Sequence, residues 1–221
     1  MTIATSISSG RKQLVELARK LDSFNLNRGT SGNCSLRTEH GFLITPSGIH
    51  VTDLSPDDIV EMDLSGETLS TGNPSSEWRF HKDIMLLKAE INAIVHVHSS
   101  HATSLSCFRK DIPAFHYMIA VAGGNSIKCA PYALFGSQSL SDNVVQALAG
   151  RKACLMSNHG MIATGKNADE ALALTIEVEA LSQQYLMALQ VGQPTLLSDV
   201  EMKEVINQFV GYGKWSHFNE Q

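Results

Sequence analysis

The sequence has few cysteines and no motif that would organise them. Its 221 residues include four cysteines, and no two of them form a CxxC pair. Structural zinc sites rely mainly on cysteine and small secreted folds rely on disulfides, so neither class is favoured. A chain of this length can bury a core without disulfides. We therefore expect free, mostly buried thiols and the reducing environment of the cytoplasm.

Long apolar runs and an excess of positive charge are also missing. No apolar stretch approaches the roughly 18–20 residues that a membrane span needs. The first residues, MTIATSISSGRKQ, lack the apolar centre of a secretory signal. Lys and Arg number 17 against 22 Asp and Glu, a formal net charge of -5, which argues against a protein that binds membranes or nucleic acid. Neither GxxxxGK[ST] nor GxGxxG occurs, so nucleotide hydrolysis and Rossmann-type redox chemistry are not favoured.

The residues that are present suffice for one folded domain. Hydrophobic residues make up 43% of the chain, and no linker or repeat divides it. Apolar residues at helical spacing predict helices after Ser9 and over 74–88, from 101, and over 141–148, 169–191 and 198–210, and a short helix is expected to start at Ser55-Pro56. Short β-branched runs predict strands over 34–37, 41–45, 60–63, 93–98, 112–117, 126–133 and 153–156. This order indicates a single α/β domain with a mixed or antiparallel sheet.

The nine histidines are the most informative residues, because imidazole is the commonest metal ligand in proteins. In the strand expected over 93–98, the side-chain period of two places His96 and His98 on one face. Two imidazoles on a buried strand need a partner, which is either a metal ion or ordinary hydrogen bonds in the core. Glu77 and His159 could complete a His₃Glu set, although a carboxylate in a first helical turn is favoured without any function. Spacing alone leaves three competitors open, namely His81, His101 and His116.

Small polar residues in three loops indicate a site for an anion. Ser75 and Ser76 are expected at a helix N-terminus, where free backbone N–H groups favour phosphate or carboxylate. Taken alone, N-capping by serine is the plainer explanation of these two residues. Two further loops add neutral donors that could line a phosphate pocket without a lysine, namely Gly29, Gly32, Asn33, Ser47 and Gly48.

Seven segments, in order over roughly residues 15–190, resemble the zinc-dependent class II aldolase/epimerase family. They are LNRGTSGNCSLR, FLITPSGI, PSSEWRFH, AIVHVHSSHAT, IPAFHYMIAVAGGNSIKCAPYALFG, SNHGMIATG and EVEALSQQYL. They are most similar to the motifs of family members that act on L-fuculose 1-phosphate. The resemblance implies one catalytic domain over 1–221, with a central, mainly antiparallel sheet flanked by helices. It also implies a homotetramer with active sites between subunits.

The same resemblance assigns roles to residues. It implies that Zn²⁺, or Mn²⁺ or another divalent ion, is held by Glu77, His96, His98 and His159. It implies that the substrate phosphate is bound by Asn33, Ser47, Gly48, Ser75 and Ser76. Glu77 would also move the proton at C1 of dihydroxyacetone phosphate, and Tyr117, reaching a neighbouring subunit's site, would exchange a proton with the C4 oxygen. The aldehyde side would include Phe135, with Phe209 and Tyr212 closing over the site.

The implied reaction is the reversible cleavage of a ketose 1-phosphate of the L-fuculose 1-phosphate type to dihydroxyacetone phosphate and a small aldehyde, through an enediolate that the metal stabilises. Salvage aldolases for 5-deoxyribulose 1-phosphate or 5-methylthioribulose 1-phosphate fit the same motifs. The ending YGKWSHFNEQ departs from the fuculose pattern, which keeps this alternative open. Sugar-phosphate 4-epimerases carry Asp in place of Glu77, and dehydratases match less closely around Tyr117. A non-catalytic adducin-like module is disfavoured because every candidate metal ligand is present.

Overall fold

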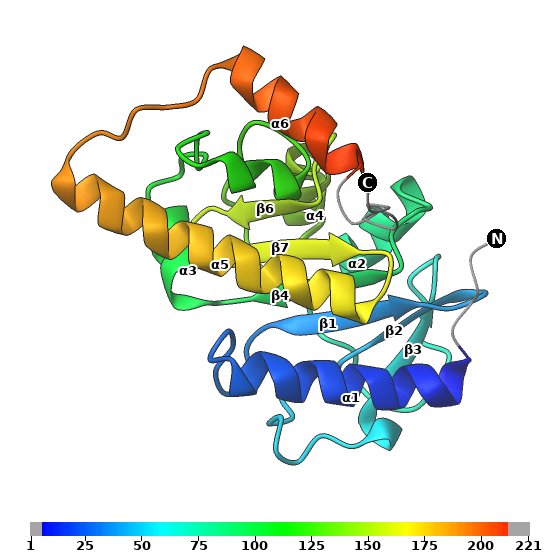
Figure 1. Ribbon diagram of the computed structural model, residues 1–221. Coiled ribbons are helices and arrows are strands. Elements are labelled where there is room, and N and C mark those ends of the chain that lie inside the picture. The colour runs from blue at the N-terminus through cyan, green and yellow to red at the C-terminus, as the bar shows by residue number, and fades with distance from the viewer. Residues whose placement is uncertain (1–5, 212–221) are drawn as a thin grey trace, which may run out of the picture.

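The computed structural model describes residues 6–211 and shows a seven-stranded sheet between layers of helices (Figure 1). The strands are β1 (Asn33–Arg37), β2 (Gly41–Ile44), β3 (Val60–Asp63), β4 (Ala93–Val97), β5 (Lys128–Ala130), β6 (Ala153–Met156) and β7 (Gly160–Gly165). They lie in the order β3-β2-β1-β4-β7-β6-β5, and every neighbouring pair is antiparallel except β5 and β6. The expected α/β class with a mainly antiparallel sheet is confirmed.

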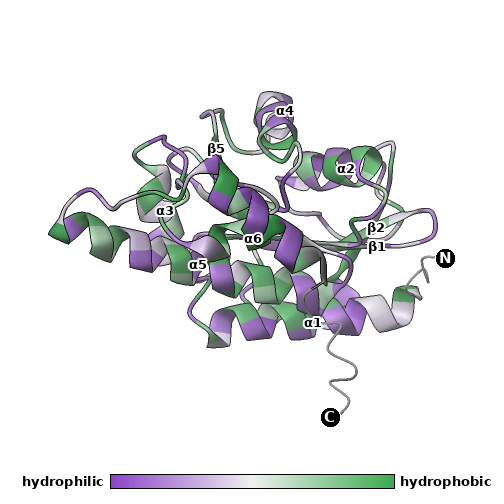
Figure 2. Ribbon diagram, turned by 45° about the horizontal axis from the view of Figure 1, so that its top comes forward, coloured by the Kyte–Doolittle hydropathy of each residue, from purple (hydrophilic) through white to green (hydrophobic). Residues whose placement is uncertain are grey.

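Helices cover both faces of this sheet (Figure 2). One face carries α1 (Ile7–Ser23), α3 (Ser100–Ser106) and α5 (Ala168–Val191), and the other carries α2 (Trp78–Leu87) and α4 (Gln138–Ala147). The last helix, α6 (Asp199–Gly211), packs on the 3₁₀-helix η2 (Tyr117–Ala122), and a second 3₁₀-helix, η1 (Pro56–Asp58), precedes β3. Within residues 6–211, no helix combines the length and the apolar character that crossing a bilayer requires.

The central strand β4 decides on which side of the sheet the site lies. All five of its residues are buried. Its alternating side chains send Val95 and Val97 into the core beneath α1, α3 and α5. Ile94 belongs to the opposite core, and the ring of His96 meets the ring of Phe80 from α2 edge-on at 5.6 Å between centroids. Burial of each apolar side chain contributes about 1.5–3 kcal/mol to the stability of the fold. This packing holds the imidazole of His96 beneath the start of α2.

Strand β7, which lies beside β4, is the element that the sequence pattern failed to predict. It begins and ends with glycine, a residue more typical of loops than of strands. The structure explains why Gly160 stands there. A Cβ at this position would lie 2.5 Å from the backbone oxygen of Val97 and 2.9 Å from the ring of His98. The missing side chain lets β7 approach the histidine-bearing strand closely.

The start of α2 also differs from the expectation. The helix begins at Trp78 rather than at 74–76, so the prediction that Ser75 and Ser76 lie at its N-terminus is wrong. The reason is a competing contact, because the backbone N–H of Ser75 donates to the carbonyl of Thr45 at 3.1 Å. This bond ties the segment to the end of β2 and leaves Glu77 as the N-cap residue of the helix.

The strand expected over 112–117 is wrong as well. Only Ile112 pairs, in an isolated bridge with Ile127. Pro113 follows directly and has no N–H to offer a ladder. His116 then caps η2 by accepting a hydrogen bond from the backbone N–H of Met118, so the chain turns into a 3₁₀-helix instead.

Candidate metal centre and active site

Three histidines meet at one end of the sheet. His96 lies in β4, His98 follows the end of that strand, and His159 lies in the short connection between β6 and β7. The antiparallel register pairs Val97 with Met161, which brings this connection beside the end of β4. One ring nitrogen from each histidine lies within 4.8 Å of the others. Nε2 of His96 is 3.1 Å from Nε2 of His98.

Hydrogen bonding fixes which nitrogen His96 presents to this centre. Nδ1 of His96 lies 2.9 Å from the backbone oxygen of Met161. A carbonyl can only accept, so Nδ1 carries the hydrogen and Nε2 turns a lone pair toward the other histidines. Burial, followed by the neighbouring His96, lowers the pKa of both His98 and His159 to about 4. At neutral pH both of these imidazoles are therefore uncharged and able to bind a metal.

Glu77 completes the cluster. Its side chain makes no capping bond to α2 and instead points to the histidines, with Oε2 3.2 Å from Nε2 of His96 and Oε1 3.3 Å from Nε2 of His159. Burial would raise the pKa of this carboxyl group, but His96, His159 and a hydrogen bond from Asn33 outweigh it and hold the pKa at about 2. The group is therefore a buried carboxylate.

These residues fit a divalent cation. Glu77 is only 6% exposed, and its Oε1 has no hydrogen-bond partner among the described residues. A buried carboxylate oxygen without a donor is costly unless a cation compensates for it. Three imidazole nitrogens and one carboxylate are the donor set that zinc and related ions accept. The sequence therefore predicted the members of this cluster, and the structure brings all four together.

A pocket of about 350 Å³ opens beside the cluster and includes Glu77, His98 and His159 in its wall. Four of the five residues expected to bind phosphate line it, namely Asn33, Ser47, Ser75 and Ser76, together with Thr30, Ser31 and Gly32 of the loop before β1. The fifth, Gly48, is not among the lining residues. Its φ of +75° makes the turn that follows Ser47, a backbone conformation that favours glycine.

Two aromatic side chains also line the pocket and form what we call its aromatic wall. Phe135, expected on the aldehyde side, lines it, as does Tyr132, which sequence reasoning missed. Both rings are more than half exposed. Asn158 also lines the pocket. Its left-handed backbone (φ +54°) is a signal visible only in the structure, although asparagine tolerates that conformation better than most residues.

The remaining predicted residues lie elsewhere in this chain. Tyr117 is not in the pocket wall, is 51% exposed, and stacks on Phe209 of α6 with ring centroids 6.5 Å apart. Phe209 is likewise absent from the wall. Tyr212 lies outside the described residues. The structure thus brings the metal and phosphate residues together and places Tyr117 apart from them.

Helix α3 supports the centre from both ends without contributing a ligand. At its N-terminus, the carboxylate of Glu179 on α5 accepts from the backbone N–H groups of His101 and Ala102, both at 2.9 Å. It also accepts from the Ser99 hydroxyl and lies 2.7 Å from Nδ1 of His101. At the C-terminal end, Ser106 receives the backbone N–H groups of the two residues before Gly160. The connections after β4 and before β7 are therefore anchored to one helix.

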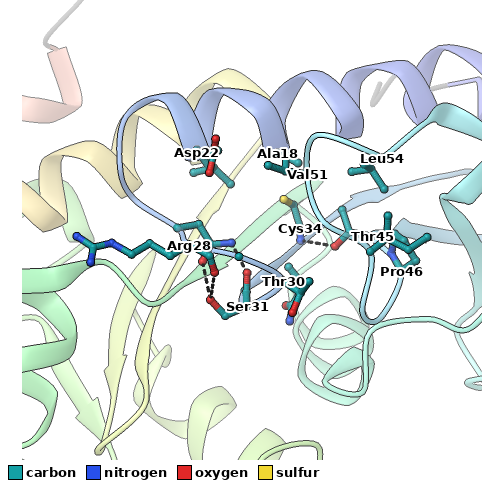
Figure 3. Close-up of a pocket in the computed structure, with 16 residues that line it drawn as sticks. Ala18, Asp22, Arg28, Thr30, Ser31, Cys34, Thr45, Pro46, Val51 and Leu54 are labelled. Atoms are coloured by element: carbon teal, nitrogen blue, oxygen red, sulfur yellow. Dashed lines mark hydrogen bonds between the residues drawn. The ribbon is translucent and has the colours of Figure 1, made fainter.

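Figure 3 shows a second cavity, behind the loop that carries Thr30 and Ser31. It lies between this loop and α1, and Cys34, which like the other three cysteines is a free thiol, faces it. The guanidinium group of Arg28 points away from it (Figure 3). Its volume of about 40 Å³ accommodates water and not a sugar phosphate. The loop is thus a thin wall whose other side faces the metal centre.

Comparison with known proteins gives one family from sequence and from structure. The sequence matches the family described as Class II Aldolase and Adducin N-terminal domain over residues 12–186. It is 47% identical over 203 residues to the 5-methylthioribulose-1-phosphate/5-deoxyribulose-1-phosphate aldolase of Rhodospirillum rubrum, covering 92% of each chain. It is 45% identical over 203 residues to the L-fuculose phosphate aldolase of Escherichia coli K12, covering 91% of this chain and 94% of the relative. A solved L-fuculose 1-phosphate aldolase superposes with a TM-score of 0.90 and 37% identity, covering 94% of this chain and 98% of the other.

Proposed function

This chain belongs to the class II aldolase and adducin N-terminal domain family and is a class II aldolase, and we propose that it cleaves a ketose 1-phosphate of the L-fuculose 1-phosphate type. The products are dihydroxyacetone phosphate and a small aldehyde, and the reaction is reversible. One observation carries this proposal: three histidines and a buried carboxylate converge, and Glu77, His98 and His159 of this cluster stand in the wall of a pocket lined by neutral donors suited to phosphate. An adducin-like binding module has no need for such a cluster.

Glu77, His96, His98 and His159 hold the ion in this proposal, and Zn²⁺ is the ion that three imidazoles and a carboxylate suit best. When bound, a divalent ion supplies Lewis-acid chemistry that lowers the energy of negative charge on the substrate oxygens. The protein's part is to keep the donor atoms in place. It does so with the hydrogen bond from His96 to Met161 and the bond from Asn33 to Glu77.

The substrate phosphate is oriented by Asn33, Ser47, Ser75 and Ser76. These residues line one wall of the pocket, next to Glu77. Amide and hydroxyl donors can bind a phosphate without a lysine, and binding energy taken from the phosphate positions the reacting carbons. Gly48 contributes through the turn that presents Ser47 rather than by lining the pocket.

Two side chains move protons. In cleavage, the phenolic oxygen of Tyr117 accepts the proton of the C4 hydroxyl while its own proton passes to the solvent, the C3–C4 bond breaks, the aldehyde leaves, and the bonding electrons form the enediolate of the dihydroxyacetone phosphate half. The Glu77 carboxylate takes up one proton from the solvent and delivers it to the carbon that was C3, which becomes the hydroxymethyl carbon of dihydroxyacetone phosphate. In synthesis the same groups act in reverse.

Tyr117 performs this step in the site of a neighbouring subunit. Its half-exposed ring lies outside the pocket of its own chain, so a second copy must bring it to the substrate. We therefore propose a homo-oligomer, a tetramer in this family, in which the whole chain 1–221 forms one catalytic domain. Phe209 stacks on Tyr117, so it reaches the aldehyde side of the same neighbouring site. A cytoplasmic location completes the proposal.

A second candidate substrate is 5-deoxyribulose 1-phosphate or 5-methylthioribulose 1-phosphate. The 47% identical relative, named for these substrates, favours it. The aromatic wall formed by Tyr132 and Phe135 also suits the methyl or methylthio group of the aldehyde that these sugars release.

A panel of ketose 1-phosphates tests both candidates. L-fuculose, 5-deoxyribulose and 5-methylthioribulose 1-phosphates are incubated with zinc-loaded protein, and dihydroxyacetone phosphate is measured with a coupled dehydrogenase. We expect release from at least one sugar, and the highest kcat/KM identifies the substrate. Absence of release from all three, with an epimerised or dehydrated product instead, would overturn the aldolase assignment. In parallel, metal analysis should find about one divalent ion per chain, and His96→Ala should lose it.

A further inference from the structure

Three buried polar side chains stand in a row behind the metal-site carboxylate. Nδ2 of Asn33 lies 3.0 Å from Oε2 of Glu77, and Oδ1 of Asn33 lies 2.6 Å from Nε2 of His81. Nδ1 of His81 lies 2.7 Å from the hydroxyl of Ser35. Asn33 is 5% exposed, and His81 and Ser35 are completely buried. Asn33 and Ser35 share one face of β1, while His81 comes from α2, four residues after Glu77.

The carboxylate of Glu77, at the head of this row, fixes the direction of every hydrogen bond along it. A carboxylate can only accept, so Asn33 must turn its NH₂ group toward Glu77. Its carbonyl oxygen then faces His81, which must donate from Nε2. A neutral imidazole has one N–H, so Nδ1 of His81 is an acceptor and the Ser35 hydroxyl donates to it. Burial, the largest cause, lowers the pKa of His81 to about 3, which keeps the ring neutral.

The opposite tautomer of His81 would disturb the site. With the hydrogen on Nδ1, the lone pair of Nε2 would face the carbonyl oxygen of Asn33 across 2.6 Å. The asparagine could relieve this contact only by turning its amide over. That rotation would direct its oxygen at the carboxylate of Glu77, two acceptors at hydrogen-bond distance. The state of His81 thus controls which group Asn33 presents to the centre.

We propose that His81 is a positioning residue, held in the Nε2–H tautomer by Ser35, that locks the Asn33 amide with its NH₂ group toward Glu77 and the pocket. The inference rests on the proposed function of the site. One hydrogen of that NH₂ group bonds Glu77, and the other serves an acceptor in the pocket, which Asn33 lines. The ligand atom at this position must therefore be an acceptor, such as a phosphate oxygen. The hydrogen bonds from Ser35 through His81 and Asn33 to Glu77 thus couple the carboxylate that would bind the metal to Asn33, which would bind the substrate.

A purely structural role makes a different prediction. The ring of His81 stacks on that of Phe80, with centroids 4.6 Å apart, so His81 could be present only to fill the core. Phenylalanine at position 81 keeps an aromatic ring but removes the donor. Glutamine keeps an N–H near the place of Nε2 but loses the ring. If packing alone mattered, His81→Phe would be the milder change. If the donor matters, His81→Gln is the milder one.

The test combines two measurements. Long-range ¹H–¹⁵N spectra of metal-free wild-type protein with labelled histidine report the tautomer of His81, and we expect hydrogen on Nε2. Zinc affinity is then measured by competition with a chelator. We expect His81→Phe to bind zinc about 10–100-fold more weakly than wild type, the usual effect of losing support behind a metal ligand. His81→Gln should stay within about threefold of wild type.

Hydrogen on Nδ1 in the wild-type spectrum would overturn the inference, whether or not either variant folds. So would equal zinc affinities for His81→Phe and the wild type, or a weaker affinity for His81→Gln than for His81→Phe. The proposed function fails in another way, namely if wild-type protein binds no zinc or releases no dihydroxyacetone phosphate. Because the tautomer is read on metal-free protein, the two failures are distinguishable.

Discussion

Glu179 offers a quantitative test of how α3 supports the metal centre. Its side chain is 16% exposed and interacts with four donors: the hydroxyl of Ser99, the backbone N–H groups of His101 and Ala102, and Nδ1 of His101. The perturbation is Glu179→Gln, which keeps the size of the side chain. It replaces one of the two acceptor oxygens with an NH₂ group, which cannot accept.

The expected cost follows from this bond pattern. Each oxygen of Glu179 serves two donors, so the amide leaves at least one buried donor facing another donor. Hydrogen bonds to charged groups contribute about 1.5–3 kcal/mol each, and loss of the negative charge at the N-terminus of α3 adds about 0.3–1 kcal/mol. Rotation of the Ser99 hydroxyl recovers part of the loss. We therefore expect the free energy of unfolding to fall by about 2–3 kcal/mol, or Tm by roughly 4–12 °C for a chain of this length.

The matched control is Glu177→Gln on the same helix. This substitution makes the same change of charge two residues earlier, and Glu177 has no hydrogen bond or ion pair within the described part of the chain. Urea unfolding of metal-free protein at fixed concentration measures both variants, and chelator competition measures their zinc affinity. Because Ser99 directly follows His98, we expect Glu179→Gln also to weaken zinc binding by about tenfold or more. A change in unfolding free energy of less than about 0.5 kcal/mol, or one equal to that of the control, would refute this reasoning.

Three further predictions concern the reaction, the phosphate loop and pH. Tyr117→Phe should lower kcat by about 100-fold or more at unchanged zinc content, and an unaltered rate of dihydroxyacetone phosphate release would remove its acid–base role. At Gly32 (φ +71°) a Cβ would lie 2.7 Å from a backbone oxygen of β4, whereas at Gly29 (φ +63°) it would meet open space, so in thermal unfolding Gly32→Ala should cost about 1–3 kcal/mol more than Gly29→Ala. The pKa of Asp58 is lowered from its ordinary 3.8, first by the hydroxyl of Ser55 and then by the backbone N–H of Ser55. The ionised carboxylate therefore stabilises the fold at pH values above 3.8. This contribution is lost as the pH falls through the lowered pKa of the folded state. Urea unfolding should accordingly show the stability difference between wild type and Asp58→Asn shrinking below about pH 4, and a difference that grows there would contradict the assignment.

Local sequence patterns predicted the structure correctly where all the residues concerned belong to a single element. The alternation in 93–98 predicted a buried strand with two histidines on one face, and the structure has β4 there with both imidazoles at one centre. Periodicity failed where a distant contact decided the conformation. Nothing near Gly160 in the sequence shows that a Cβ at this position would lie 2.5 Å from the backbone oxygen of Val97. The sequence pattern therefore predicted no strand where β7 lies.

The residues that support the metal centre could not be predicted from the sequence either, because contacts between distant segments determine their roles. Glu179 is one of several glutamates on the long helix α5, and only the docking of α5 on α3 distinguishes it from Glu177. Glu179 lies 78 positions after His101, its main partner, in the sequence. The sequence could propose His81 as a neighbour of Glu77 because helical spacing places the two four residues apart. The intervening Asn33 comes from another strand.

Each member of the proposed ligand set is held by a residue that is not a ligand, and each of these supports comes from a different part of the fold. The supports are the Met161 carbonyl for His96, the Glu179 carboxylate for the turn after His98, the Ser106 hydroxyl for the backbone of His159, and the Asn33 amide for Glu77. Ligands fixed in this way lose little conformational freedom when a cation binds. Metal binding should therefore stabilise the fold through bonds to donor atoms that are already in place rather than by ordering loops. Accordingly, the backbone amides of residues 96–102 and 156–161 should be protected from hydrogen exchange almost equally with and without zinc, and large gains in protection on zinc addition would show that the centre is assembled by the metal instead.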